Sequence, residues 1–191
     1  MISSTYTSAK TPKAPANTEC IRNTVTYAPV ADVTVLRLMM AVAVQHGSKL
    51  RHADVSTAFL QSAITDVVYV RQPQGHVHKG DQGQFMVMRL KRNLYGLKTS
   101  AKAWYDTMDQ YLQSLGFQNS DTTPCLYVHP GGSIILLYED DLLIKGCTDE
   151  RGDELYQLLR KRFLMKDLGD VSLYLGIQTG YDRNTGLMNI N

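Results

Sequence analysis

The segment Ser133–Gly146, SIILLYEDDLLIKG, limits what this chain can fold into more than any other segment. Two short runs of Ile, Leu and Tyr flank three consecutive acids, Glu139, Asp140 and Asp141. Two β-prone runs around a tight polar break are typical of an antiparallel hairpin. The break has no glycine, although the central positions of such turns often need a positive φ. Three negative charges between apolar strands cost stability unless a cation compensates them, so the sequence predicts a cation-binding site at the tip of this hairpin.

A second acid supports this interpretation. Asp54 lies in the segment Lys49–Leu60, which begins as a strand, and alanine and valine flank it. An acid in an otherwise apolar strand needs a partner or a metal ion. Asp54 and Asp140, with Asp141 in support, form the minimum carboxylate set for two divalent cations, because Mg²⁺ takes one or two carboxylates plus water and phosphate oxygens. A solvated acidic turn is the simpler alternative and accounts for most short acid runs.

Hydrophobic periodicity predicts the remaining elements. Helices are expected over 31–47, over 100–115 and after the capping residue Thr148, each with one apolar face. Strands are expected over 67–72, 85–91 and 125–128, and a second hairpin is expected to join 173–179 to 187–190 through 182–186. This order predicts an α+β fold in which helices back an antiparallel sheet, with a βαββαβ-like arrangement.

Composition sets the limits on function. The chain has 191 residues, 43% of them hydrophobic, so one domain with one core is the default. Residues 1–25 are rich in Ser, Thr, Lys, Pro and Ala, which predicts a disordered leader, with the ordered domain over 26–191. Three widely spaced cysteines give no zinc or disulfide pattern, which indicates reduced thiols and an intracellular, cytoplasmic protein. No apolar run approaches the length of a membrane span, so no membrane partner is expected.

The charge is unevenly distributed although the net charge is only +2. Between Arg71 and Lys102 there are seven Lys and Arg residues and one acid. Between Glu139 and Glu154 there are seven acids and two basic residues. A basic segment beside an acidic one suits a polyanion held over a cation-binding centre, and two ordinary solvated faces are the alternative.

Five blocks of the sequence, in this order and spacing, resemble the reverse transcriptase of copia-type LTR retrotransposons. The blocks are TYAPVADVTVLRLMMAVA, ADVSTAFLQSAITDVVYVRQPQG, RLKRNLYGLKTSAKAWYDTM, LLYEDDLLIKG and FLMKDLGDVSLYLGI. The resemblance covers about residues 27–190. It implies a right-hand polymerase palm with partial fingers, RNA- and DNA-templated DNA synthesis, and two magnesium or manganese ions.

The resemblance also implies roles for individual residues. Asp54, Asp140 and Asp141 would be catalytic and would bind metal. Phe59 matches an aromatic that stacks under the deoxyribose, Tyr138 would pack beside the primer end, and Glu139 would face the incoming nucleotide. Four consecutive residues match the block that lines the template and primer: Tyr95, Gly96, Leu97 and Lys98.

The implied partners are an RNA template, a DNA primer and product, deoxynucleoside triphosphates and the remainder of a Pol polyprotein, in a virus-like particle where the element is intact. We expect an incomplete reverse transcriptase without a ribonuclease H domain. The family usually carries valine where this chain has Glu139, and a carboxylate there would repel a triphosphate. The alternative function is therefore a catalytically inactive remnant, a folded palm with at most nucleic-acid binding.

Overall fold

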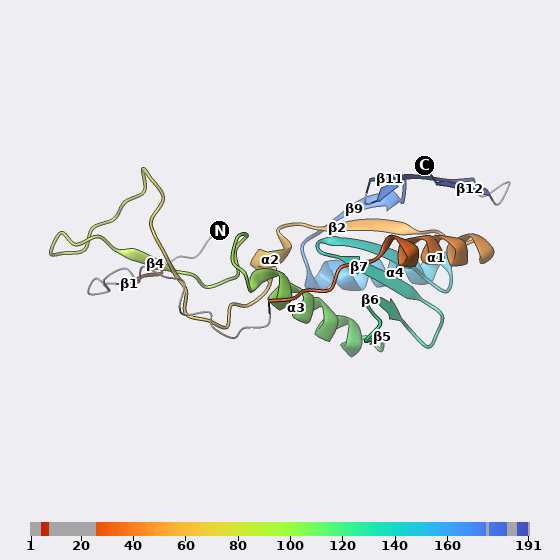
Figure 1. The fold of residues 1–191 in the computed structure, drawn as a ribbon, viewed down its shortest axis with the longest axis horizontal. Coiled ribbons are helices and arrows are strands. Elements are labelled where there is room, and N and C mark those ends of the chain that lie inside the picture. The colour runs from red at the N-terminus through yellow and green to blue at the C-terminus, as the bar shows by residue number, and fades with distance from the viewer. Residues whose placement is uncertain (1–4, 8–25, 175, 183–186, 191) are drawn as a thin grey trace. The chain divides into compact units, whose positions relative to one another are not determined.

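The chain forms two compact units in the computed structural model, which describes residues 5–7, 26–174, 176–182 and 187–190. Unit 1 comprises Met1–Tyr27 and Phe59–Trp104, and unit 2 comprises Ala28–Ala58 and Tyr105–Asn191 (Figure 1). Two helices, α2 (Ala58–Gln61) and α3 (Ser100–Ser114), run across the sequence boundaries between the units. The expectation of a single ordered domain over 26–191 stays a prediction.

Unit 1 contains a three-stranded antiparallel sheet with the order β1-β4-β3. Its strands are β1 (Thr5–Thr7), β3 (Tyr69–Val70) and β4 (Val87–Arg89). β3 and β4 are shorter than predicted. Next to them, the Gln72 side chain donates to the carbonyl oxygens of His78 and Met86. β1 lies in the segment 1–25 that is predicted to be a disordered leader, and the rest of this segment lies outside the described residues.

Unit 2 contains a six-stranded antiparallel sheet with the order β5-β6-β7-β8-β2-β9 and a three-stranded sheet with the order β10-β11-β12. Its elements are α1 (Val33–Gln45), β2 (Arg51–Val55), β5 (Gln118–Ser120), β6 (Thr123–Val128), β7 (Ile134–Tyr138), β8 (Asp141–Lys145), α4 (Asp149–Arg162), β9 (Met165–Asp170), β10 (Leu173–Tyr174), β11 (Ile177–Asp182) and β12 (Leu187–Ile190). The α+β class is confirmed.

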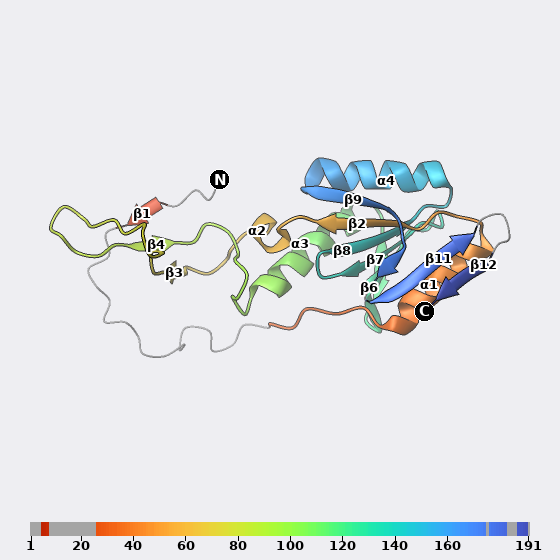
Figure 2. The same cartoon turned by 90° about the horizontal axis from the view of Figure 1, so that it is seen from above.

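Four strands of the large sheet pair in the spatial order β7-β8-β2-β9. Along the chain, α2, β3, β4, α3, β5 and β6 lie between β2 and β7, and α4 lies between β8 and β9. The expected βαββαβ-like arrangement stays a prediction. Figure 2 shows α4 on one side of these strands and α1 on the other. β2 therefore lies inside the sheet, between β8 and β9, where an acidic side chain has neighbours on both sides.

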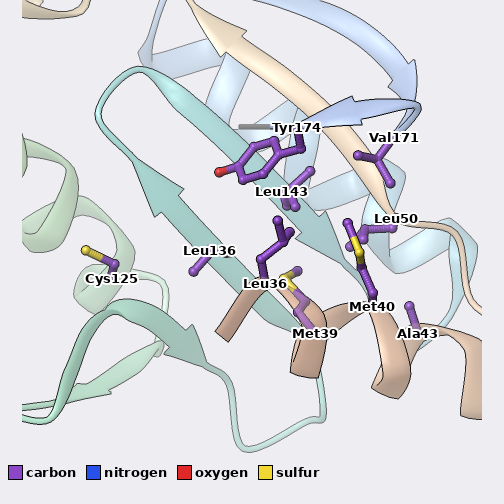
Figure 3. Packing of buried hydrophobic residues seen from close by; sticks show 10 residues of the cluster. All are labelled: Leu36, Met39, Met40, Ala43, Leu50, Cys125, Leu136, Leu143, Val171 and Tyr174. Carbon is purple, nitrogen blue, oxygen red and sulfur yellow. The ribbon is translucent and has the colours of Figure 1, made fainter. Parts of the chain in front are cut away.

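Helix α1 covers the face of the sheet that carries Leu136 and Leu143. Alternation along β8 places Asp141 on that same face and Leu142 on the opposite one. The buried cluster joins α1, the sheet and the segment around β10, as Figure 3 shows. Its members are Leu36, Met39, Met40, Ala43, Leu50, Cys125, Leu136, Leu143, Val171 and Tyr174.

Helix α4 covers the other face. The guanidinium of Arg51, next to His52 in β2, lies 4.9 Å from the ring centroid of Tyr156 in α4. The same guanidinium donates to Asp153 in α4 and Asp167 in β9, so one side chain links three elements. These contacts hold β9, an edge strand with mostly exposed side chains, against β2.

Helix ends follow the predicted capping chemistry. The Asp32 side chain accepts a hydrogen bond of 2.6 Å from the backbone N–H of Thr34 at the start of α1. Thr148 accepts from the backbone N–H of Arg151 at 3.2 Å at the start of α4. Acids occupy the first turn of α4 and basic residues its last turn, which suits the helix dipole. No helix within the described ranges is long and apolar enough to cross a membrane.

The predicted strand over 173–179 is divided in two. Gly176 has a φ of +79° between β10 and β11, and this left-handed conformation interrupts the strand. β11 and β12 pair antiparallel as predicted, and residues 183–186 of the expected turn lie outside the described residues. β5 and β9 were not predicted, because neither shows the alternation of apolar and polar residues.

Burial gives Cys125 and Cys147 different expected reactivities. Cys125 is buried in the core cluster, which raises its pKa to about 11, whereas Cys147 is exposed. The thiolate is the reactive form, so at pH 8 only about one Cys125 in a thousand is reactive. We expect brief iodoacetamide treatment at pH 8 to label Cys147 and spare Cys125, as read by peptide mass mapping. Both should be labelled in denaturant, and equal labelling of the native protein would contradict the burial of Cys125.

Candidate active site

The acid-tipped hairpin forms as predicted. β7 and β8 pair from Ile134 opposite Lys145 to Tyr138 opposite Asp141, so Glu139 and Asp140 are the two residues of the turn. Glu139 has a φ of +53°, at the first central position, where a type II′ turn also has positive φ. Such a conformation is uncommon for a residue other than glycine. The chain thus places an acid where a hairpin ordinarily carries glycine.

Asp54 lies directly opposite Asp141. The register of β2 and β8 pairs these two residues, and paired residues in an antiparallel sheet point to the same face. The backbone N–H of Val55 donates to the carbonyl oxygen of Asp140 at 2.7 Å, which fixes the turn against the end of β2. Asp54 is more than eighty residues from Asp140 and Asp141 in sequence, and the sheet places all three at the same end of β2 and β8.

The acids influence one another electrostatically. Burial raises the pKa of Asp140, a backbone hydrogen bond opposes this effect, and the charges of Asp141 and Asp54 raise the pKa further. The side chains of Asp54 and Asp141 are 29% and 32% exposed, so solvent and an ion can still reach them. Repulsion among close, partly buried carboxylates favours the arrival of a cation.

Two cationic or polar neighbours lie beside the acids. Lys166 of β9 is paired with Asp54 in the sheet register, and its Nζ lies 4.0 Å from Oδ2 of Asp54. His52 of β2 places Nε2 3.0 Å from Oδ1 of Asp141. Sequence analysis identified neither residue. Strand alternation would have placed His52 on the face of Asp54, two residues away, whereas Lys166 belongs to a strand without an alternating pattern.

The donor set suits a hard divalent cation. Carboxylate oxygens are the ligands that Mg²⁺ prefers, and it fills the rest of its shell with water and phosphate oxygens. Within the described ranges, no group of three or more His, Cys, Asp and Glu side chains is arranged so that it could hold a metal ion. The predicted set of three metal-binding acids is thus not preassembled, and the fit to Mg²⁺ rests on the chemistry of Asp54, Asp140 and Asp141.

Tyr138 belongs to the same face as the acids. It pairs with Asp141 across the hairpin and packs, partly buried, against the core cluster under α1. The resemblance places this residue beside a primer end. Its described contacts anchor the strand that leads into the turn.

Unit 1 brings together Phe59 and Tyr95, two of the residues that the resemblance singles out. Their ring centroids lie 4.5 Å apart with a tilt of 36°. The buried Asn93 ties the Tyr95 loop to the segment after α2, because its side-chain amide donates to Ser62 Oγ at 2.9 Å and to the Ala63 carbonyl oxygen at 2.7 Å. Sequence analysis missed Asn93 and Ser62, which are buried polar residues with no distinguishing pattern.

The loop from Tyr95 to Lys98 is exposed at most of its positions. Tyr95 is 50% exposed, and the loop continues through Gly96, which has a φ of +92°. An added Cβ at Gly96 would meet nothing within 4 Å, so the backbone conformation and not the space requires glycine there. The backbone N–H of Leu97 donates to the carbonyl oxygen of Leu94 at 3.2 Å and closes the turn.

The sequence comparisons agree with these blocks. A family described as "Reverse transcriptase (RNA-dependent DNA polymerase)" matches residues 14–190. The retrovirus-related Pol polyproteins from transposons RE2 and RE1 of Arabidopsis thaliana are 40% and 38% identical to this chain over 156 residues, 80% of its length. The corresponding polyprotein from transposon TNT 1-94 of Nicotiana tabacum is 32% identical over 163 residues, 83% of the chain. The chain spans only 10–12% of the length of these relatives. This chain belongs to the reverse transcriptase family, in the form carried by the Pol polyproteins of copia-type retrotransposons.

Proposed function

We propose that this chain is the polymerase portion of a copia-type reverse transcriptase and extends a DNA primer on an RNA or DNA template. In this proposal unit 2 is the palm and unit 1 contributes part of the fingers. The observation that carries the proposal is the register that sets Asp54 opposite Asp141, with Asp140 in the adjoining turn. Membership of the family supports the type of reaction, and the position of the acids supports the use of metal ions in it.

Asp54 and Asp140, with Asp141 beside them, would hold two Mg²⁺ ions. When bound, the ions lower the pKa of the attacking primer hydroxyl and neutralise the triphosphate and its pyrophosphate leaving group. The protein's part would be to hold the carboxylates in position. The bond from Val55 to the Asp140 carbonyl and the β2–β8 pairing perform that task.

Unit 1 would supply contacts to nucleotide and template. Phe59 would stack under the deoxyribose and exclude a 2′-hydroxyl, and its contact with Tyr95 supports a shared aromatic surface. Six of the seven basic residues between positions 71 and 102 are exposed, which suits binding to phosphates without sequence readout. These six are Arg71, Lys79, Arg89, Lys91, Arg92 and Lys98.

Primer extension on a poly(rA) template with an oligo(dT) primer, dTTP and Mg²⁺ tests the proposal. Incorporation that stops on addition of EDTA is the expected result. The second candidate function, a remnant that binds nucleic acid without catalysis, is favoured by the charge of Glu139 beside the proposed metal-binding acids. Salt-sensitive binding of the template–primer without incorporation would support the remnant and reject the polymerase.

Glu139→Gln is expected to raise incorporation at limiting dTTP about fivefold, since removing one repulsive charge near a triphosphate is worth about 1 kcal/mol. The measurement is the KM for dTTP, which should fall. Glu139→Asp is the matched control because it keeps the charge. Glu139→Val removes the charge as well, but it places a β-branched side chain at a φ of +53°, which adds strain to the turn. An unchanged or higher KM in Glu139→Gln would show that the charge does not oppose nucleotide binding.

A further inference from the structure

His52 occupies a defined position beside the acids. It lies in β2 two residues before Asp54, so the two side chains share a face. Its neighbour across β8 is Leu143, and Asp141 lies two residues before Leu143, which makes Asp141 a diagonal neighbour of His52. Diagonal pairs lie within reach of ring side chains, and here Nε2 of His52 is 3.0 Å from Oδ1 of Asp141.

The imidazole is held in place by a buried aromatic ring. The ring centroids of His52 and Tyr174 are 5.2 Å apart at an interplanar angle of 76°, an edge-to-face contact. Tyr174 is 1% exposed and belongs to the core cluster under α1, where Figure 3 shows its ring beside Leu143. His52 itself is only 12% exposed in its side chain. The ring therefore has little freedom to turn away from Asp141.

The hydroxyl group of Tyr174 is a second notable feature beside His52. Among the described residues its hydroxyl is the buried side-chain polar atom without a hydrogen-bond partner. A buried unpaired hydroxyl costs free energy that a phenylalanine would not. Tyr174 thus fixes His52 by ring packing.

We propose that His52 is a positioning residue that orients the Asp141 carboxylate for divalent metal binding. The inference rests on the proposed function, in which Asp141 supports the two ions. With its proton on Nε2, the imidazole donates to one carboxylate oxygen and restricts rotation of the group, while the other oxygen takes no part in this bond. Hydrogen-bond partners of metal ligands typically change metal affinity or activity about 10–100-fold when they are removed.

Two substitutions separate donation from packing. His52→Phe keeps an aromatic ring against Tyr174 and removes the donor. His52→Gln removes the ring and keeps an N–H donor on a side chain of similar reach. If His52 has only a structural role, His52→Phe should be tolerated better than His52→Gln in both metal affinity and thermal stability. If His52 positions Asp141, His52→Gln should bind metal more tightly than His52→Phe, whichever of the two variants is thermally more stable.

The experiment is a Mn²⁺ titration of the full chain without nucleic acid, in which electron paramagnetic resonance measures free Mn²⁺. We expect His52→Phe to weaken Mn²⁺ binding about 10–100-fold and His52→Gln to stay within about threefold of the unsubstituted protein. His129→Phe is the matched control, since His129 also packs edge-on against an aromatic ring, Phe117, at 5.3 Å. Affinity in His52→Phe equal to the unsubstituted protein, or equal weakening in Phe and Gln, overturns the proposal.

Magnetic resonance of the histidine ring covers the case in which His52→Phe does not fold. Addition of Mg²⁺ should shift the His52 ring signals in the unsubstituted protein and leave them in place in Asp141→Asn. Ring signals that do not respond to saturating Mg²⁺ overturn the proposal.

The two proposals fail separately. A protein that incorporates nucleotides, and whose His52→Phe variant binds Mn²⁺ normally, contradicts the positioning role alone. A protein without incorporation, whose Mn²⁺ affinity nevertheless depends on the His52 donor, contradicts the polymerase alone.

Discussion

Asp140→Asn is expected to abolish primer extension, with incorporation reduced by a factor on the order of 10³ or more. In the proposed function Asp140 would hold the ions, and its loss would remove several kcal/mol of transition-state stabilisation; about 4 kcal/mol corresponds to a thousandfold in rate. Asp54→Asn should give a loss of the same order, because Asp54 lies opposite Asp141 in the pairing of β2 with β8. The measurement is the rate of dTTP incorporation on poly(rA) at saturating Mg²⁺.

The same substitution should not destabilise the fold. Burial and the charges of Asp141 and Asp54 raise the pKa of Asp140, so the ionised group is less favourable in the folded chain than in the unfolded one. A neutral amide removes that repulsion, and the midpoint of thermal unfolding should stay level or rise. Asp121→Asn, a change at an exposed acid outside the site, is the control and should alter neither property. Incorporation near the normal rate in Asp140→Asn would remove Asp140 from the catalytic proposal.

Local pattern was sufficient to predict the elements that carry the acids. The apolar runs on either side of residues 139–141 can only be buried if they pair, which predicts β7 and β8 and the position of the turn between them. An acid inside the apolar start of residues 49–60 indicated Asp54 as a functional residue. Pairing of Asp54 with Asp141 required the spatial order of the strands, which the βαββαβ pattern only suggested.

What sequence analysis missed depends on tertiary contacts. β9 contains mainly exposed residues without alternation, and the Arg51 side chain, which also bonds α4, helps to hold it in the sheet. Lys166 gains its position beside Asp54 only because β9 pairs with β2. In unit 1, the contact between Phe59 and Tyr95 joins segments far apart in sequence. A single sequence gives no signal for such pairs beyond the family resemblance.

Gly146→Ala is expected to destabilise the protein by about 3 kcal/mol or more, and to lower the midpoint of thermal unfolding by roughly 6–12 °C. Gly146 directly follows β8 and lies against the first turn of α4. A Cβ added there would overlap the backbone N of Gly152 and the carbonyl oxygen of Thr148, and would lie 2.8 Å from Cα of Gly152. These atoms form the 3.1 Å hydrogen bond from Gly152 N–H to the Thr148 oxygen that begins the helix. Backbone atoms cannot move aside as a flexible side chain could.

Gly180→Ala is the matched control for this effect. Gly180 lies within β11, an added Cβ would meet nothing within 4 Å, and its φ is not in the left-handed region. Alanine there reduces the entropy of the unfolded chain without a clash, so the unfolding midpoint should be unchanged or slightly higher. If Gly146→Ala also melts within about 2 °C of the unsubstituted protein, α4 does not pack against the end of β8 as the structure shows.

β8 begins with Asp141, and Gly146 follows its last residue. Loosening the contact between Gly146 and α4 should therefore also weaken metal binding at the Asp141 end of the strand.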